Sequence, residues 1–334
     1  MIVLGVETTA HTFGIALLDV KSENEKKVLC NLRDVYTTEK GGMIPAKLAE
    51  HHEEVCGTVL EKAFAQTGLS MKDVDLIAVS NAPGLGHALK MGSLFARSLA
   101  LRHKKPLVGV NHCIAHLEVA SLVTTAKDPV LLYCSGANTQ VIAYDGGKYR
   151  IFGETLDTGV GNFLDTFARD LGLGFPGGPA IERLAANARH KDKLFALPYS
   201  VKGMDVAFSG ILTHLERKAI GKEPAEEIAY SVQEVVFAML VEVAERAMAH
   251  CEKSELVLGG GVACNKRLQE MARRMCADRG ASCFIPENGL LVDNAAMIAW
   301  TGWLMHVKGG IADDAATLEI DPYERTDEVV VTWR

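Results

Sequence analysis

Two histidines lie four residues apart in the segment Asn-His-Cys-Ile-Ala-His, at positions 112 and 116. The segment follows an apolar run that reads as a strand, and Asn111 suits the N-cap of a helix. Residues at i and i+4 share one helical face, so imidazoles of His112 and His116 can converge on one ion. Two hydrogen-bonded histidines near a helix end would give the same pattern. The spacing favours metal ligation.

The spacing also matches the zinc peptidase motif His-Glu-x-x-His. That motif needs a glutamate directly after the first histidine, where it acts as the general base. Cys113 occupies that position here. A thiol cannot replace the carboxylate there, so the sequence disfavours a metallopeptidase.

A third ligand has to come from elsewhere in the chain. Asp293 begins a small-residue segment that reads as a helix, where it could simply be an N-cap. Capping and metal binding can coexist, because a cap uses one oxygen. Tyr133, at the end of an apolar strand, could add a phenolate oxygen. Two imidazoles, a carboxylate and a phenolate suit iron or zinc better than magnesium or calcium.

Two small-residue turns could meet a nucleotide. The turn that begins at Ser135 can offer backbone amides to phosphate or carbamoyl oxygens, although an ordinary hairpin turn is an equal alternative. The three glycines around Gly260 would let a purine or ribose approach the backbone, with Asn265 contacting the nucleoside. Neither a GxGxxG fingerprint nor a Walker lysine is present, which argues against hydride transfer and Walker-type ATPases.

Further acids and turns could complete such a site. Asp165 and Glu182 each follow a glycine-containing turn and could hold ribose hydroxyls, although single acids are commonly solvated helix-face charges. The Pro-Gly-Gly-Pro stretch from Pro176 predicts a rigid turn. Glu7, Thr8 and Thr9, at the end of the first strand, could face phosphates or magnesium, as could the Pro-Gly-Leu-Gly stretch from Pro83; each could also be a plain turn.

Strands and helices alternate along the chain, which predicts an α/β protein. The halves resemble each other: residues 3–19 and 131–145 both read strand, small turn, strand, and residues 75–103 and 255–279 both read strand, glycine-rich turn, helix. We therefore predict the two-lobed actin-like/sugar-kinase/Hsp70 ATPase fold, with duplicated lobes and a ligand cleft between them. The lobes are residues 1–125 and 126–334; the second carries inserted helices, and its C-terminal segment could return to the first. Any doubly wound α/β protein is the alternative.

Composition sets limits on the setting. The 334 residues are 48% hydrophobic and 23% charged, with a net charge of −7. No apolar run approaches the roughly 20 residues of a membrane helix, and the N-terminus lacks the features of a signal peptide. The eight cysteines form no CxxC pair, which predicts free thiols in a reducing cytoplasm.

Taken together, these motifs resemble the universal family that makes threonylcarbamoyladenosine at position 37 of tRNA, once called O-sialoglycoprotein endopeptidases. The Ser-Gly-Ala-Asn-Thr turn and Tyr133 are most similar to the archaeal and eukaryotic branch, the catalytic subunit of the KEOPS complex. The matching stretches occur in family order over nearly the whole chain: 5–9, 83–92, 111–118, 133–140, 161–165, 175–182, 208–210, 259–265 and 293–296.

The resemblance implies the actin-like fold and transfer of threonylcarbamoyl from its adenylate to the adenine amine. It implies one iron or zinc ion, an adenine nucleotide (threonylcarbamoyl-AMP or ATP), tRNA, a separate small kinase subunit and small dimerising subunits. It implies catalytic roles for His112, His116 and Asp293, which with Tyr133 would be the metal ligands. The implied adenylate contacts are Tyr133, Cys134, Ser135, Gly136, Ala137, Asp165, Gly178, Glu182 and Asn265.

Three rival functions stay open on the sequence. A small-molecule kinase of the same fold would need a catalytic acid near its acceptor but no histidine pair. A metallopeptidase conflicts with Cys113. A non-catalytic scaffold would leave the two histidines and Asp293 unexplained.

Overall fold

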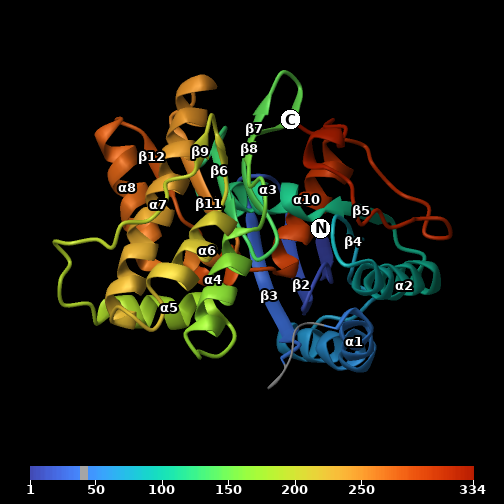
Figure 1. Ribbon diagram of the computed structural model, residues 1–334. Coiled ribbons are helices and arrows are strands. Elements are labelled where there is room, and N and C mark those ends of the chain that lie inside the picture. Colours follow the sequence, from blue (N-terminus) through green and yellow to red (C-terminus); the bar gives the residue numbers. More distant parts are fainter. Residues whose placement is uncertain (38–43) are drawn as a thin grey trace. The chain divides into compact units, whose positions relative to one another are not determined.

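A computed structural model describes residues 1–37 and 44–334 of the chain. These residues form two compact units, each built around its own mixed sheet (Figure 1). The first unit comprises Met1–Thr125, Gly147–Tyr149 and Asp293–Arg334, and the second comprises Ala126–Gly146 and Arg150–Val292. The assignment of residues 1–125 and 126–334 to separate ligand-binding lobes stays a prediction.

The first unit contains a five-stranded sheet with the order β3-β2-β1-β4-β5. The first three strands form an antiparallel meander, and β4 and β5 continue the sheet in parallel with β1. Their bounds are β1 Ile2–Glu7, β2 Thr12–Val20, β3 Lys26–Val35, β4 Leu76–Ala82 and β5 Leu107–Asn111.

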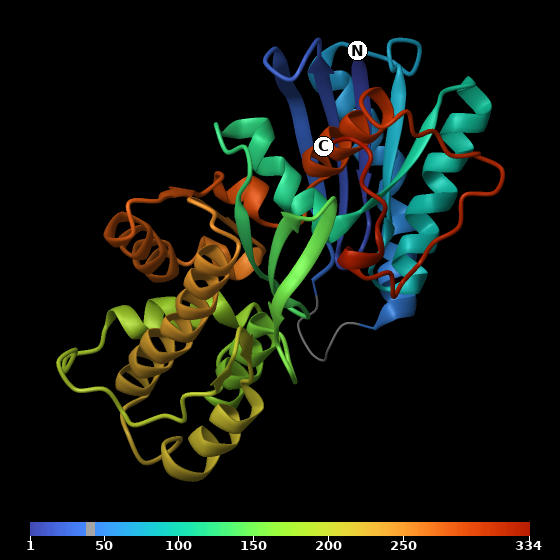
Figure 2. The ribbon, with the colours of Figure 1, turned by 90° about the horizontal axis from the view of Figure 1, so that it is seen from above.

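Helices cover the two faces of this sheet, because side chains alternate along each strand. Leu4 and Val6 of β1 pack into a core with α1 and α2, whereas a Cβ on Gly5 would meet α10 on the opposite face. Figure 2 shows the blue strands side by side, with red α10 along one face. The helices are α1 Pro45–Thr67, α2 Gly86–His103, α3 His112–Val123 and α10 Ala295–Val307, with a 3-10 turn at Thr326–Glu328.

The second unit repeats this sheet. Its order β12-β11-β6-β7-β8, read backwards, matches the first sheet strand for strand, with β6 in the place of β1. Here too β6 pairs antiparallel with β7 and parallel with β11, so the predicted duplication is confirmed. The strands are β6 Val130–Cys134, β7 Thr139–Asp145, β8 Lys148–Glu154, β11 Glu255–Gly259 and β12 Ser282–Phe284, with a separate ribbon of β9 Val201–Lys202 and β10 Asp205–Val206.

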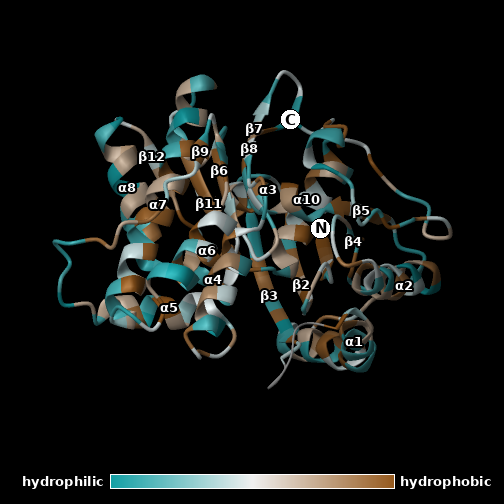
Figure 3. Cartoon of the chain, in the orientation of Figure 1, coloured by the Kyte–Doolittle hydropathy of each residue, from teal (hydrophilic) through white to brown (hydrophobic). Residues whose placement is uncertain are grey.

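The helices of the second unit bury one large apolar core against this sheet. In Figure 3 strands β6 and β11 are largely brown, while outer turns of helices such as α8 carry teal. The long helix α7 begins at Ala225, because Pro224 occupies its N-cap. The helices are α4 Val160–Asp170, α5 Gly177–Ala186, α6 Ser209–Lys218, α7 Ala225–His250, α8 Lys266–Asp278 and α9 Asn288–Leu291, with the 3-10 turn η1 Gly261–Cys264.

Among the residues described, no helix combines the length and apolarity needed to cross a membrane.

Candidate metal centre

The start of α3 brings the two histidines together. The side-chain oxygen of Asn111 accepts hydrogen bonds from the amides of Cys113 at 3.0 Å and Ile114 at 3.2 Å, which confirms it as the N-cap. His112 is therefore the first residue of α3, and His116 follows one turn later. Their ring centroids lie 4.7 Å apart with the planes at 78°. Both rings are buried.

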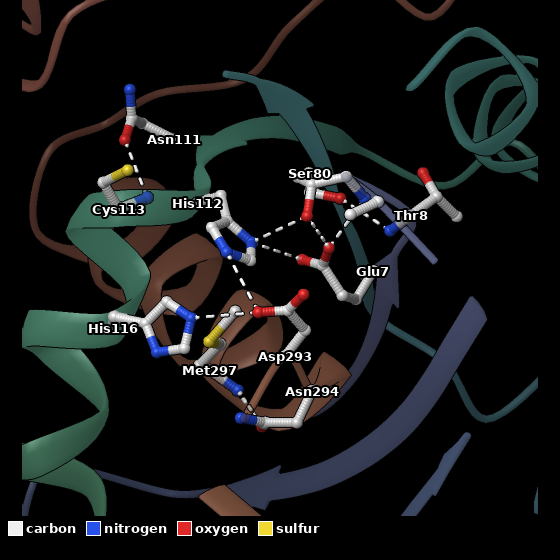
Figure 4. A network of polar contacts seen from close by, with 12 residues as sticks. Glu7, Thr8, Ser80, Asn111, His112, Cys113, His116, Asp293, Asn294 and Met297 are labelled. Carbon is white, nitrogen blue, oxygen red and sulfur yellow. Dashed lines mark hydrogen bonds and ion pairs between the residues drawn. The ribbon is translucent and has the colours of Figure 1, made fainter. Parts of the chain in front are cut away.

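Asp293 completes the group from a distant part of the sequence. One carboxylate oxygen, Oδ1, lies 3.3 Å from Nε2 of His112 and 3.4 Å from Nε2 of His116 (Figure 4). The alternative role of Asp293 as helix cap is taken by its neighbour: Oδ1 of Asn294 accepts from the Met297 amide at 3.0 Å. The Asp293 carboxylate is consequently directed to the histidines.

Glu7 and Thr9 support His112 from the other side. Glu7 Oε2 and the Thr9 hydroxyl each lie 3.1 Å from Nδ1 of His112. The second oxygen of Glu7 accepts from the Thr9 amide at 2.7 Å and from the Thr9 hydroxyl. When Nδ1 donates its proton to this pair, Nε2 keeps a lone pair directed to Asp293, as in the carboxylate–histidine pairs behind metal ligands.

Burial and charge shift the pKa values of His116 and Asp293. Burial lowers the pKa of His116, so its imidazole is neutral at pH 7. Burial alone would raise the pKa of Asp293, but His112 and His116 outweigh it, and the pKa of this carboxyl lies well below its usual range. Neutral imidazoles and an ionised carboxylate are the forms that bind metal ions.

The separations fit a metal ion. One donor atom from each of the three residues lies within 4.8 Å of the other two. Neighbouring ligands on a metal with bonds of about 2.1 Å lie roughly 3 to 3.5 Å apart, which matches the two distances to Asp293. The structure therefore contains a group able to hold a metal, as predicted from the sequence. Tyr133, the fourth expected ligand, is buried near the end of β6 in the second unit.

The properties of Cys113 argue against a peptidase. The residue is buried, and burial raises the pKa of its thiol. A protonated thiol in this position cannot serve as the general base that the peptidase motif requires.

In the second unit, the turn after β6 is held by backbone contacts. Ser135 and Gly136 carbonyls accept from the amides of Gly161 at 3.0 Å and Asn162 at 2.9 Å. A Cβ on Gly161 would lie 2.7 Å from the Gly136 Cα, so a glycine is needed for this approach. The turn, which includes Ala137, is thereby fixed against the start of α4.

The remaining expected adenylate contacts are linked to this turn through a closed circuit of contacts. Asp165 of α4 accepts from the Gly177 amide at 2.7 Å, beside Gly178 at the start of α5. Glu182 of α5 accepts from the Lys266 amide at 2.9 Å, beside Asn265. The circuit closes at Gly260, where a Cβ would meet the Cys134 carbonyl at 2.3 Å. The fold thus brings residues from four separate stretches into one neighbourhood of the second unit.

The side chains in this circuit already have protein partners. Oδ1 of Asn265 accepts from the Arg267 amide at 2.8 Å, and its Nδ2 donates to Gln233 at 2.9 Å. Asn265 is therefore the N-cap of α8, and contact with a nucleoside stays a prediction. Asp165 and Glu182 are partly buried acceptors of backbone amides rather than solvated charges.

The expected phosphate-facing residues lie in two places. Glu7, Thr8 and Thr9 are buried, and Glu7 and Thr9 contact His112 as described. The Thr8 amide donates to the Ser80 hydroxyl at 3.0 Å. Gly260 lies in the second unit with a left-handed φ of 87°. Their contact with phosphate stays a prediction.

Sequence reasoning missed two features of the centre. It left the support of His112 by Glu7 unrecognised, because a pair 105 residues apart has no sequence signal. It also missed Asn294 as the cap of α10, although a following asparagine was as good a capping candidate as Asp293.

Comparisons with known proteins agree with these findings. Residues 27–300 match the family profile described as tRNA N6-adenosine threonylcarbamoyltransferase (TsaD). The enzyme of that name from Thermococcus kodakarensis is 53% identical over 334 residues, which covers 100% of both chains. The "Probable bifunctional tRNA threonylcarbamoyladenosine biosynthesis protein" of Thermoplasma volcanium is 46% identical and covers 100% of this chain, which spans 62% of that protein.

A solved structure supports the fold. The structure of T. kodakarensis HypF aligns with a TM-score of 0.60 at 16% identity, covering 90% of this chain and 47% of HypF. At this identity the likeness concerns the fold alone. The predicted actin-like α/β fold is confirmed.

Proposed function

Because the chain belongs to the tRNA N6-adenosine threonylcarbamoyltransferase family, we propose that it transfers threonylcarbamoyl from threonylcarbamoyl-AMP to the exocyclic amine of adenosine 37 in ANN-decoding tRNAs. The family match spans most of the chain, so the protein is a tRNA-modifying transferase, as the sequence predicted. The observation that carries the proposal is the convergence of His112, His116 and Asp293 in a protein of this family.

The proposed cofactor is one iron or zinc ion. Two imidazole nitrogens and a carboxylate oxygen form a mixed ligand set that suits either metal and leaves coordination positions open. When bound, the ion would supply Lewis acidity toward a carbonyl or carboxylate oxygen of the donor. Tyr133 is a proposed fourth ligand.

The adenylate half of the donor is assigned to the circuit in the second unit. Neither Gly178 nor Gly261 has a heavy atom within 4 Å of an added Cβ, so the internal packing does not require these glycines. Open space at such positions supports close approach by a ligand. The proposed contacts are Tyr133, Cys134, Ser135, Gly136, Ala137, Asp165, Gly178, Glu182 and Asn265.

The adenine amine is a weak nucleophile, because its lone pair is delocalised into the ring. Catalysis by this chain therefore consists mainly of positioning the two substrates. The backbone amides of Gly136, Ala137 and Gly178 are suited to orient the adenylate. A base in the anticodon loop is unpaired and can turn outward to reach such a site.

The proposed partners are tRNA, a separate small kinase subunit and the small dimerising subunits of the KEOPS complex, in the cytoplasm. The T. volcanium relative, of which this chain spans 62%, is named a bifunctional protein of the same biosynthesis, which supports a second function acting beside the transferase.

The test uses His112→Ala and His116→Ala with the partner subunits present. We expect each substitution to remove bound metal and to lower transfer from the adenylate by about 100-fold or more, as loss of a ligand that orients the donor should. Metal content is measured by elemental analysis, and modified adenosine by mass spectrometry of the tRNA.

His103→Ala, at the end of α2, is the matched control and should leave both measurements unchanged. Unchanged transfer together with unchanged metal content in both His112→Ala and His116→Ala would exclude the proposed role. A phosphorylated small molecule formed by the wild-type chain would instead favour the rival kinase.

A further inference from the structure

Helix α3, which carries both imidazoles, has no separate polar and apolar faces that would fix its rotation about its own axis. Of its 12 residues, all but Ser121 and Val123 are buried, and most are apolar. A helix that is apolar on every side has no amphipathic face to set its orientation about its own axis. A rotation by one residue, about 100°, would nevertheless turn His112 and His116 away from Asp293.

One buried carboxylate on this helix has an unusually full set of partners. Glu118 is 3% exposed. Its Oε1 accepts from Trp333 Nε1 and from Arg334 Nε, both at 3.1 Å, and also from the Tyr149 hydroxyl. Its Oε2 accepts from Arg334 Nη2 at 3.3 Å. All four residues belong to the first unit.

The partners of Glu118 are themselves held in place. Trp333 and Tyr149 are buried, and the Arg334 guanidinium carbon lies 5.5 Å from the centroid of the Tyr149 ring. Arg334 Nε also contacts the Tyr149 hydroxyl at 3.0 Å. This group, Glu118 with Tyr149, Trp333 and Arg334, is called the Glu118 cluster below.

The Glu118 cluster contacts α3 on a side of the helix different from the one that carries His112 and His116. At about 100° per residue, Glu118 lies roughly 140° around the helix from the midpoint of His112 and His116. A contact on that side restrains rotation without occupying the metal-binding face. The partly buried Ser121 makes smaller polar contacts: its hydroxyl accepts from Trp300 Nε1 at 2.8 Å, and its carbonyl accepts from Lys26 Nζ at 2.6 Å.

A buried ion pair contributes little net stability compared with apolar side chains of the same shape, because desolvation offsets the attraction. A buried glutamate in an otherwise apolar helix is therefore better explained by specificity of position. We propose that Glu118 is a positioning residue that holds α3 in the rotation at which His112 and His116 both face Asp293. The inference rests on the proposed function, because it requires a metal at these three residues.

The test measures Co²⁺ binding to the full chain, with His112→Ala defining binding at the three-residue group. Glu118→Gln keeps the shape of the side chain but removes its charge and presents an amide to the donors of Arg334 and Trp333. We expect Co²⁺ to bind at least about 10-fold more weakly and its visible absorption spectrum to shift, because the imidazoles are less well oriented. Thermal unfolding should remain cooperative.

Glu255→Gln is the matched control. The Glu255 carboxylate accepts from the amides of Lys127 and Asp128, both at 2.8 Å, in the second unit. Its loss should lower the melting temperature and leave Co²⁺ affinity and spectrum unchanged. If Glu118→Gln does not fold, Tyr149→Phe removes one of the donors to Glu118 together with one acceptor of Arg334, and should weaken Co²⁺ binding by a few-fold.

The outcomes separate this inference from the proposed function. Co²⁺ binding by the wild type that His112→Ala abolishes supports the metal site. Given that result, a folded Glu118→Gln or Tyr149→Phe with wild-type affinity and spectrum would overturn the positioning role alone. Absence of Co²⁺ binding by the wild type would overturn the metal site itself and the inference with it.

Discussion

His112 uses its two ring nitrogens for different tasks. Nδ1 faces Glu7 and Thr9, and Nε2 faces Asp293. Because the carboxylate fixes the tautomer, the metal-binding nitrogen is determined by a residue that does not itself bind the metal. Binding at this centre should therefore depend on Glu7 nearly as much as on the ligands.

We predict that Glu7→Gln lowers metal affinity by about 10- to 100-fold, the usual effect of losing a carboxylate behind a ligand histidine. The measurement is competition of the protein with a chelator for Zn²⁺ at pH 7.5. Asp313→Asn is a matched control, because Asp313 accepts from the Gly109 amide at 2.7 Å within the same unit. Equal affinities for Glu7→Gln and the wild type would contradict the orienting role.

The buried His52 makes the stability of the folded protein depend on pH. It is fully buried, with Nε2 3.0 Å from the Ala10 carbonyl and Nδ1 3.2 Å from Nδ1 of His51. Burial lowers the pKa of His52 to about 4, although the Ala10 carbonyl and Glu7 oppose the shift and His51 and His11 add to it. The folded protein therefore keeps this imidazole neutral where the unfolded chain, with an ordinary pKa of about 6.5, binds a proton.

Since the unfolded state binds more protons between about pH 6.5 and pH 4, stability must fall as the pH decreases through that window. Protonation of His52 in the unfolded chain lowers the stability by up to about 3 kcal/mol, and this penalty is absent above about pH 7 and complete below about pH 4. We predict that His52→Leu flattens the pH dependence of the urea midpoint between pH 7 and pH 5. Parallel curves for His52→Leu and the wild type would refute this.

Among the helices and strands, the close approach of α2 to the end of β1 fixes the segment Glu7–Thr9. A Cβ on Gly92 of α2 would lie 1.9 Å from the Thr8 hydroxyl oxygen and 2.8 Å from the Thr8 Cβ. Both residues are buried, so neither can move outward. The helix therefore sits as close to the loop as glycine allows.

We predict that Gly92→Ala destabilises the protein by about 1–3 kcal/mol, as overpacking a buried contact does. Gly57→Ala in α1 is the matched control. It is exposed with nothing within 4 Å of an added Cβ, and should stabilise by about 0.5–1 kcal/mol through helix propensity. Urea denaturation measures both variants, and a Gly92→Ala protein as stable as Gly57→Ala would contradict the close packing.

At the scale of the whole molecule, the chain carries 35 basic and 42 acidic residues, which gives its net charge of −7. Affinity for nucleic acid depends mainly on cations that neutralise phosphates. In this chain the acidic side chains outnumber the basic ones and repel phosphates. The proposed partner subunits would therefore have to supply part of the contact with tRNA.

We predict that the isolated chain binds a tRNA transcript with a Kd of about 1 µM or weaker at physiological salt, the range of non-specific binding. Addition of the partner subunits should tighten binding and steepen its dependence on salt. Fluorescence titration with labelled transcript at two salt concentrations measures both. Tight, salt-sensitive binding by the chain alone would show that it carries a tRNA surface of its own.

Much of the fold could be predicted because its signals are local. Apolar runs indicate the strands, and a glycine is a local signal for a helix end, as at Gly68, whose amide donates to the Phe64 carbonyl after α1. The repeated order of turns and helices predicted the duplicated sheets. Exact helix boundaries are harder to predict: α7 begins at Ala225 because Pro224 occupies its N-cap.

The sequence by itself determined that His112 and His116 share a helical face, because i and i+4 spacing is a property of the helix alone. It also determined the cap at Asn111, which is equally local. Only the tertiary structure decided that Asp293, 177 residues from His116, turns its carboxylate to the imidazoles while Asn294 caps α10. The tertiary structure alone also decided that Glu7 contacts Nδ1 of His112 and that Glu118 accepts hydrogen bonds from Arg334. Such pairs depend on which surfaces pack together, and packing joins residues that no local spacing relates.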